Sequence, residues 1–383
     1  MIDQFTRWDY YYSIVRSSGY LARSQKERAI KSLDVLRKSF GNDWLFWAVK
    51  NNHPIFWDLR GIEADGNLSN ILTLGNAISR LKNVKGFVSL FWKLKKNKDF
   101  YSTFTELEVA FELRKKKASI VLEPQINGKK PDILCEYRGK QVLFEVKSLG
   151  QAKNTLKATI TVSTLSSHRD IPIHPCGKVF KIMEGNELQD TKNEVSRVCN
   201  TSIKTNSPSE CHIPGKVKFY FVPEGVKNRV EIYQKWCDKQ DFFDGGSRGR
   251  KGGLLYPNDN VSQEKRVLTR LSRIKKEKQL PENKPGIVFF ESHQFYFFIK
   301  ENIEKMVGVL RNNGDKIRNI VAIVLESKVI GDEIREKKLV KEKNDHVLIT
   351  SYPFGILQKD TLIIKNPFSN FEMDLDFITK LFY

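Results

Sequence analysis

The sequence predicts an α/β protein in which a mixed sheet is flanked by helices. Three observations lead to this class. The stretch 131–147 holds two short runs of alternating apolar residues around a tight turn, which is typical of a β-hairpin. Two continuous apolar runs, Gly286 to Glu291 and Ile320 to Leu325, indicate central strands that are covered on both faces. Apolar residues at helical spacing separate these runs and fill most of residues 1–100.

The charge of the chain restricts the class of partner. Among 383 residues, 65 are Lys or Arg and 45 are Asp or Glu, which gives a formal net charge of +20. Such a surplus repels itself unless it meets a polyanion, and phosphate groups commonly neutralise it. We therefore expect nucleic acid as the partner, with an anionic membrane surface as the weaker alternative. The length predicts two domains, or one core with large additions.

Cysteine usage and hydropathy predict the compartment. The five cysteines are odd in number and form no C-x-x-C pair, so reduced, buried thiols fit better than a disulfide framework. No apolar run approaches the ~18 residues of a membrane span, and the N-terminus lacks a basic segment followed by an apolar one. The sequence thus predicts a cytoplasmic protein without a membrane segment.

Residues 1–100 are predicted to form a helical N-terminal domain. Apolar residues recur at helical spacing from Ile30 to Phe40, and Ser24 with Glu27 forms a capping box before them. A later helix is predicted from Phe87 to Leu94. Its lysine-rich tail is typical of a solvated face.

The segment 101–150 is predicted to contain a helix followed by a three-stranded meander. In the helix, Glu106 shares a face with apolar residues, so we expect it to look toward the sheet and Glu108 to point away. Turn signals at Asn127-Gly128 and Arg138-Gly139 then separate three short strands.

The last strand of the meander carries a charged pair on one face. Because side chains alternate along a strand, Phe144 and Val146 lie on one face, while Glu145 and Lys147 point together to the other. Asp132, at the entrance of the neighbouring strand, is expected beside Glu145. Two converging carboxylates suit Mg²⁺, which prefers oxygen ligands and keeps waters for a substrate phosphate. A lysine beside them is suited to orient an attacking water and to offset charge that develops on phosphorus.

These residues resemble the PD-(D/E)xK nuclease superfamily, which includes many restriction endonucleases. The matching residues are Pro131-Asp132 and, thirteen positions after the aspartate, Glu145-Val146-Lys147. Family members also commonly supply an acidic residue from the helix before the meander, which here corresponds to Glu106. The resemblance implies a restriction-endonuclease-like mixed sheet flanked by helices. It implies catalytic roles for Asp132, Glu145, Lys147 and Glu106, and Mg²⁺ or Mn²⁺ held by the three carboxylates and the carbonyl of Val146.

The rest of the chain is predicted as an insertion and the second part of this core. Residues 151–257 separate the motif strand from the next helix, and a glycine-rich loop within them carries Arg248, Arg250 and Lys251, which are suited to contact phosphates. The core, begun in 101–150, resumes over 258–383 with an amphipathic helix. The outward Arg270 and Arg273 of that helix are further candidates for binding nucleic acid.

The sequence also predicts the secondary structure of two segments near the C-terminal end. The charged stretch from Arg335 to Lys343 is predicted as an exposed loop or helix. Thr361 to Lys365 is predicted as an edge strand.

The predicted function is that of a metal-dependent endonuclease that hydrolyses phosphodiester bonds, in restriction, phage defence or repair. DNA is favoured over RNA because most of the resembling family cuts DNA, which is an analogy. One alternative left open is a catalytically inactive nucleic-acid-binding protein. Another is a subunit of a larger nucleoprotein complex, with the N-terminal helices contacting a partner protein. A homodimer is also left open.

A structural explanation of the same residues stays open as well. Glu145 and Lys147 would then be a solvated pair on a strand. Thr103 with Glu106 would be a capping box at the start of the helix.

Overall fold

The computed structural model divides into two compact units, and each is described by itself. The first contains Met1–Gly150 and Gln263–Tyr383, and the second contains Gln151–Ser262. The structure describes residues 2–63, 65–149, 176–181, 183–223, 225–240, 254–255, 263–277, 279–292, 303–330, 339–343, 345–354 and 357–382.

Helices fill the first part of the first unit. They are α1 (Ile2–Phe5), α2 (Trp8–Ser17), α3 (Arg23–Phe40), α4 (Asn42–Lys50), α5 (Pro54–Arg60), α6 (Asp65–Leu81), α7 (Phe87–Leu94) and α8 (Phe100–Lys115). The cap of α3 differs from the predicted capping box, because Gln25 accepts a hydrogen bond from the backbone of Ala22 at 2.8 Å. These helices share one hydrophobic core with the sheet, so residues 1–100 are not a compact unit of their own.

An eight-stranded mixed sheet forms the centre of this unit, in the order β1-β2-β3-β8-β9-β12-β11-β10. Its strands are β1 (Ser119–Leu122), β2 (Ile133–Tyr137), β3 (Lys140–Ser148), β8 (Gly286–Ser292), β9 (Ile320–Ile330), β10 (Leu339–Lys343), β11 (His346–Phe354) and β12 (Leu357–Lys365). The pairs β3–β8 and β8–β9 are parallel, and the others are antiparallel. The predicted α/β class with a mixed sheet between helices is confirmed.

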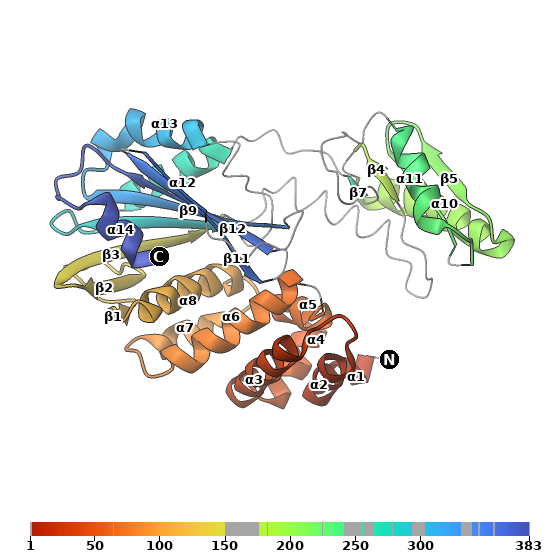
Figure 1. Cartoon of the computed structure of the whole chain (residues 1–383), viewed down its shortest axis with the longest axis horizontal. Coiled ribbons are helices and arrows are strands. Elements are labelled where there is room, and N and C mark those ends of the chain that lie inside the picture. The colour runs from red at the N-terminus through yellow and green to blue at the C-terminus, as the bar shows by residue number, and fades with distance from the viewer. Residues whose placement is uncertain are drawn as a thin grey trace. The chain divides into compact units, whose positions relative to one another are not determined.

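The two faces of the sheet are covered by different helices (Figure 1). Alternation along β3 sends Phe144 and Val146 into the core formed with α8 and with α14 (Leu375–Phe382). It sends Leu143 to the opposite face, beneath α12 (Gln263–Glu277) and α13 (Ile303–Asn313). The short helix η2 (Gly314–Lys316) connects α13 to β9. Each residue of β3 therefore has a fixed side of the sheet.

Two predicted segments take different structures. Thr361 to Lys365 belongs to β12, which lies between β9 and β11 and is not an edge strand. The strand β10 is one edge of this sheet, and it is formed by the last five residues of the stretch predicted as an exposed loop or helix, whose residues 335–338 lie outside the described residues. Charged residues are common on edge strands because they discourage pairing with other chains, and that composition also resembles a loop.

The second unit contains a four-stranded sheet in the order β5-β6-β4-β7. Its elements are β4 (Cys176–Val179), α10 (Gly185–Thr205), β5 (Ser209–Ile213), β6 (Val217–Phe221), α11 (Arg229–Asp238) and β7 (Leu254–Leu255). Residues of α10 pack with the sheet in a small hydrophobic core of their own. The proposed phosphate-contacting residues Arg248, Arg250 and Lys251 lie outside the described residues.

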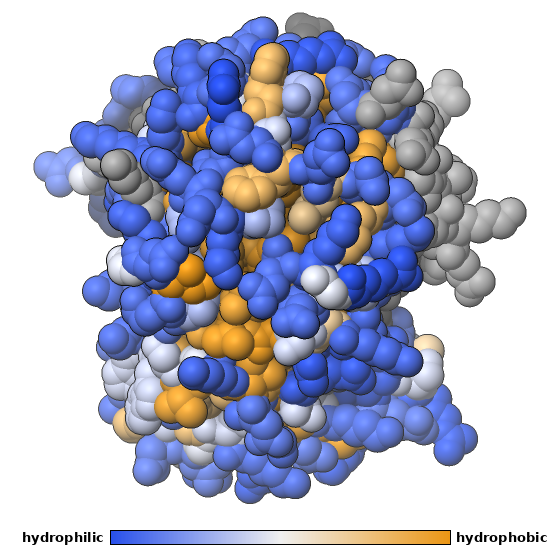
Figure 2. All heavy atoms as spheres, turned by 90° about the vertical axis from the view of Figure 1, so that its left-hand side faces the viewer, coloured by the Kyte–Doolittle hydropathy of each residue, from blue (hydrophilic) through white to orange (hydrophobic). Residues whose placement is uncertain are grey.

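The surface agrees with the strongly charged composition. Figure 2 shows a face that is covered mostly by hydrophilic side chains, with hydrophobic ones gathered near its middle. Among the described residues, no helix has both the length and the apolar character that crossing a membrane requires.

Candidate active site

The hairpin of β2 and β3 places an aspartate beside a glutamate. Arg138 and Gly139 form its turn with positive φ values of 50° and 75°, a backbone conformation that glycine adopts readily. Ile133 pairs with Phe144 in the antiparallel ladder, and the backbone N–H of Asp132 donates to Phe144 O at 3.0 Å. Asp132 therefore lies just before the ladder begins, on a level with Glu145.

Three of the predicted groups come together at this point. The backbone N–H of Val146 donates to Asp132 Oδ2 at 2.7 Å, which fixes the carboxylate against β3. Lys147 Nζ lies 3.9 Å from Asp132 Oδ2 and forms an ion pair with Glu145 Oε1. Glu145 is only 1% exposed, so this is not the solvated strand pair that the structural explanation requires.

Glu106 joins the group from α8. Its side chain is buried and interacts electrostatically with Asp132 and Lys147. The helix begins at Phe100, so Thr103 lies within its first turn and does not cap it. A capping box therefore does not explain Glu106.

Burial makes these carboxyl groups weaker acids than usual. It raises the pKa of Glu106 well above its ordinary value, and the neighbouring Asp132 raises it further. Burial also raises the pKa of Asp132, with Lys147 and the Val146 N–H opposing the change. The pKa of Glu145 rises to about 8 for the same reason, with a further contribution from Asp132. The ionised forms of all three groups therefore need more positive charge nearby.

The neighbouring carboxylates stabilise the charged form of Lys147. Burial lowers the pKa of Lys147, but Asp132 and Glu145 outweigh that effect and raise it. The Lys147 ammonium thus interacts with three carboxylates, those of Asp132, Glu145 and Glu106.

The carboxylates of these residues are of the ligand type that a hard divalent cation prefers. Glu106 Oε2 and Glu145 Oε2 are buried oxygens without a hydrogen-bond partner among the described residues. Unpartnered buried carboxylate oxygens are costly, and binding a cation removes that cost. The backbone N–H of Val146 binds Asp132. The carbonyl of Val146 is the further ligand that the resemblance implies.

Glu123 and Lys93 lie near the candidate active site, and neither was predicted there from the sequence. Glu123, after β1, accepts from Lys93 of α7 at 2.5 Å and from Lys130 at 2.9 Å. Burial lowers the pKa of Lys93, but Glu123, Glu106 and Asp132 outweigh it and raise the pKa. Lys93 was predicted as part of a solvated lysine run, and only the packing of α7 shows its place at the site.

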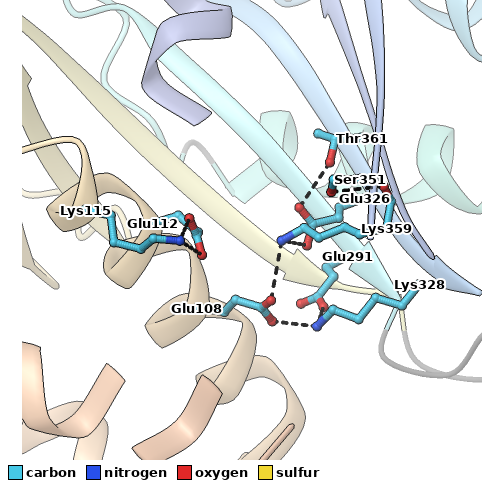
Figure 3. A network of polar contacts seen from close by, with 9 residues as sticks. All are labelled: Glu108, Glu112, Lys115, Glu291, Glu326, Lys328, Ser351, Lys359 and Thr361. Atoms are coloured by element: carbon cyan, nitrogen blue, oxygen red, sulfur yellow. Dashed lines mark hydrogen bonds and ion pairs between the residues drawn. The ribbon is translucent and has the colours of Figure 1, made fainter. Parts of the chain in front are cut away.

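A second polar centre lies on the face of the sheet that carries α8 (Figure 3). Lys328 Nζ is 2.8 Å from both Glu108 Oε2 and Glu291 Oε1. Lys359 Nζ is 2.7 Å from Glu326 Oε1 and 3.5 Å from Glu108 Oε1. Glu108 is thus buried against the sheet, and the prediction that it points away was wrong.

This second centre is a network of ion pairs. Oxygens of Glu108, Glu291 and Glu326 all lie within 4.8 Å of one another, a spacing that also suits a metal ion. Two lysine ammonium groups already occupy the space between these carboxylates and compensate much of their charge. We therefore assign the network to the anchoring of α8 on β8, β9 and β12.

The predicted arginines of α12 are exposed on its surface. Arg273 Nε pairs with Glu277 Oε1 at 2.6 Å, and Arg270 lies one turn earlier in the helix. Glu277 interacts electrostatically with both Glu145 and Lys147, so the end of α12 lies near the candidate active site. Contact between these arginines and nucleic acid stays a prediction.

Comparisons with known proteins provide no family for this chain. No protein-family model matches it, and no match was found among curated proteins.

Proposed function

We propose that this protein is a metal-dependent endonuclease of the PD-(D/E)xK type, with a restriction-endonuclease-like core, and that DNA is its preferred substrate. The convergence of Asp132, Glu145 and Lys147 at the end of one hairpin carries this proposal, together with Glu106 of α8, which interacts electrostatically with Asp132 and Lys147. The order of elements supports it, because α8 precedes the three-stranded meander and α12 follows β3 and packs on the sheet.

Each side chain then has a distinct task. Asp132, held by the Val146 N–H, and Glu145 hold a Mg²⁺ or Mn²⁺ ion together with the Val146 carbonyl, and Glu106 completes the ligands or binds a second ion. When bound, the cation lowers the pKa of a coordinated water and polarises the scissile phosphate. Lys147 positions the attacking water and offsets the negative charge that develops on phosphorus.

The net charge of +20 supports a polyanionic substrate. Restriction, phage defence and repair are all settings in which such an enzyme acts. A catalytically inactive binding protein would share the charge but would not need unpartnered carboxylate oxygens beside a lysine.

Cleavage of plasmid DNA and of single-stranded RNA, with Mg²⁺, Mn²⁺ or EDTA, tests the proposal. We expect cleavage that requires the metal and falls at least ~100-fold in Asp132→Asn, Glu145→Gln and Lys147→Met, since each removes a group that acts on the reacting centre. Glu136→Gln is the matched control, because Glu136 is an exposed glutamate of the same hairpin. Equal cleavage by all four variants, or no cleavage by the wild type, would contradict the proposal.

A further inference from the structure

The helix α7 and its flanks form a uniformly basic segment of the first unit. From Lys82 to Lys98 the chain contains six lysines and no aspartate or glutamate. They are Lys82, Lys85, Lys93, Lys95, Lys96 and Lys98, and four of them are exposed. A surface of this kind attracts a polyanion.

The outer face of α7 also exposes large apolar side chains. Phe87, Leu90 and Leu94 are buried on the inner side, as the helical spacing requires. Val88 is 66% exposed and Trp92 is 61% exposed, and these two residues lie one turn apart on the same face. Exposed indole next to lysines is the combination that single-strand-binding surfaces use, because bases stack on aromatic rings while lysines contact phosphates.

The same helix reaches the candidate active site. Ser89 and Lys93 both donate to Glu123, and Lys93 interacts electrostatically with Glu106 and Asp132. Trp92 is the neighbour of Lys93 in the chain, and Lys95 Nζ lies 4.9 Å from the centre of its indole ring system. The exposed aromatic surface and the acidic site therefore meet on one short helix.

We propose that α7 is a docking surface for an unpaired nucleic-acid strand that enters the candidate active site. Trp92 stacks on a base, and Lys95 and Lys96 contact the adjoining phosphates. This inference rests on the proposed function and names its substrate class, which is a strand with accessible bases. An indole that projects from a convex helix can stack on an unpaired base, whereas bases inside a duplex are covered by their neighbours.

A second exposed tryptophan offers a matched control. Trp57 of α5 is 50% exposed and has the guanidinium of Arg60 at 5.7 Å, so it resembles Trp92 in exposure and in its cation. The two tryptophans differ in where their helices lie. The helix α7 reaches the candidate active site through Lys93, whereas α5 supplies no residue to it.

Binding measured without metal tests the proposal. Fluorescence anisotropy in EDTA compares a labelled 20-nucleotide single strand with the duplex of the same sequence, for wild type, Trp92→Ala, Trp92→Phe and Trp57→Ala. Loss of one stacked base is expected to weaken single-strand binding by Trp92→Ala about 5- to 100-fold. Trp92→Phe should retain most of the affinity, and Trp57→Ala should stay within about twofold of wild type, since it does not touch the surface.

The outcomes separate this inference from the proposed function. Single-strand binding that is unchanged in Trp92→Ala, or lowered equally in Trp57→Ala, overturns the docking surface even if the protein cleaves DNA. An equal loss for single strand and duplex overturns the assignment to unpaired bases, and absence of single-strand binding by the wild type overturns the proposal as well. Binding that depends on Trp92 in a protein without metal-dependent cleavage supports the surface and rejects the nuclease. Thermal melting of each variant establishes that it is folded.

Discussion

Lys328 donates a hydrogen bond of 2.8 Å to Glu108, a residue 220 positions earlier in the chain, and both side chains are buried. Lys328 lies on β9 and Glu108 on α8, so the contact joins the helix to the middle of the sheet. Glu106 lies two residues before Glu108 on the same helix. The buried network therefore holds the helix that brings a carboxylate to the candidate active site.

The first prediction concerns this anchor. Lys328→Met removes the ammonium group from two buried carboxylates, Glu108 and Glu291. Leaving buried charges without a partner is expected to lower the free energy of unfolding by about 3 to 5 kcal/mol. Denaturation by guanidinium chloride measures the change.

A surface pair provides the comparison for that variant. Lys343 and Glu304 form an ion pair at 3.0 Å with side chains 63% and 67% exposed. Lys343→Met is expected to cost less than about 1 kcal/mol, because solvent screens the pair. Similar losses in the two variants would show that the buried network does not anchor α8.

The second prediction concerns the pH dependence of stability. His53 is fully buried, with Nε2 3.2 Å from Leu94 O and Nδ1 accepting from the Ile55 N–H at 3.3 Å. Burial lowers its pKa from 6.5 to about 4. Between these values the unfolded chain binds a proton that the folded protein does not. Stability therefore falls as the pH is lowered from 6.5 toward 4, by about 3 kcal/mol from this residue.

A variant without the titrating ring isolates this effect. His53→Asn keeps an acceptor at the N-terminus of α5 and does not titrate. The difference in unfolding free energy between wild type and variant should shrink on acidification from pH 6.5 to 4.5. A constant difference over that range would contradict a neutral, buried His53.

The third prediction tests the backbone that sets α7 in place. Gly86 has φ of +92°, and a Cβ at this position would lie 2.1 Å from Leu122 O of β1. Gly86→Ala combines left-handed strain with a clash against backbone. Gly128 has φ of +72° and open space around it, so Gly128→Ala is expected to cost only the strain, about 1 to 2 kcal/mol. Urea denaturation should show a clearly larger loss for Gly86→Ala, and equal losses would exclude the close approach to β1.

The fourth prediction concerns the balance between stability and metal binding. Glu106 is a buried carboxylate with an oxygen that lacks a hydrogen-bond partner among the described residues. Glu106→Gln removes a carboxyl group whose ionisation is opposed by burial, and it is expected to raise the metal-free stability by about 0.5 to 2 kcal/mol, as relief of strain at functional sites often does.

Isothermal titration with Mn²⁺ completes that experiment. Affinity for Mn²⁺ should fall in Glu106→Gln if this carboxylate is a ligand. In Glu112→Gln, a change two turns of α8 nearer its C-terminus, affinity should be unchanged, because Glu112 pairs with Lys115 at 2.9 Å away from the site. Unchanged affinity in both variants would remove Glu106 from the ligands.

The hairpin was predictable because its geometry is local. Alternation along β3 determines that Phe144 lies on one face and Glu145 on the other, and the turn at Arg138-Gly139 sets the register that brings Asp132 to Glu145. The same kind of reasoning gave a wrong orientation for Glu108 in helix α8. It is buried on most of its surface, so spacing could not show that Glu106 and Glu108 are both inside.

The remaining site residues depend on tertiary packing. The lysine run after Phe91 gives no local indication that Lys93 meets Glu123, because that contact requires α7 to pack beside β1. The sequence does contain an indication of the ion-pair network around Lys328. Glu291 and Glu326 follow apolar runs and pair with each other across β8 and β9, so two buried strands end in facing acids.

The parallel pairing of β3 with β8 has a consequence for synthesis on the ribosome. Leu143 of β3 pairs with Gly286 of β8, and the whole second unit lies between these two strands in the sequence. The strand that carries Glu145 and Lys147 therefore has no partner on its β8 side until the second unit has been translated. At ordinary elongation speeds that delay is on the order of ten seconds, during which the nascent chain presents an open strand edge. The hairpin that carries the candidate active site therefore gains its parallel neighbour only late in the synthesis of the polypeptide.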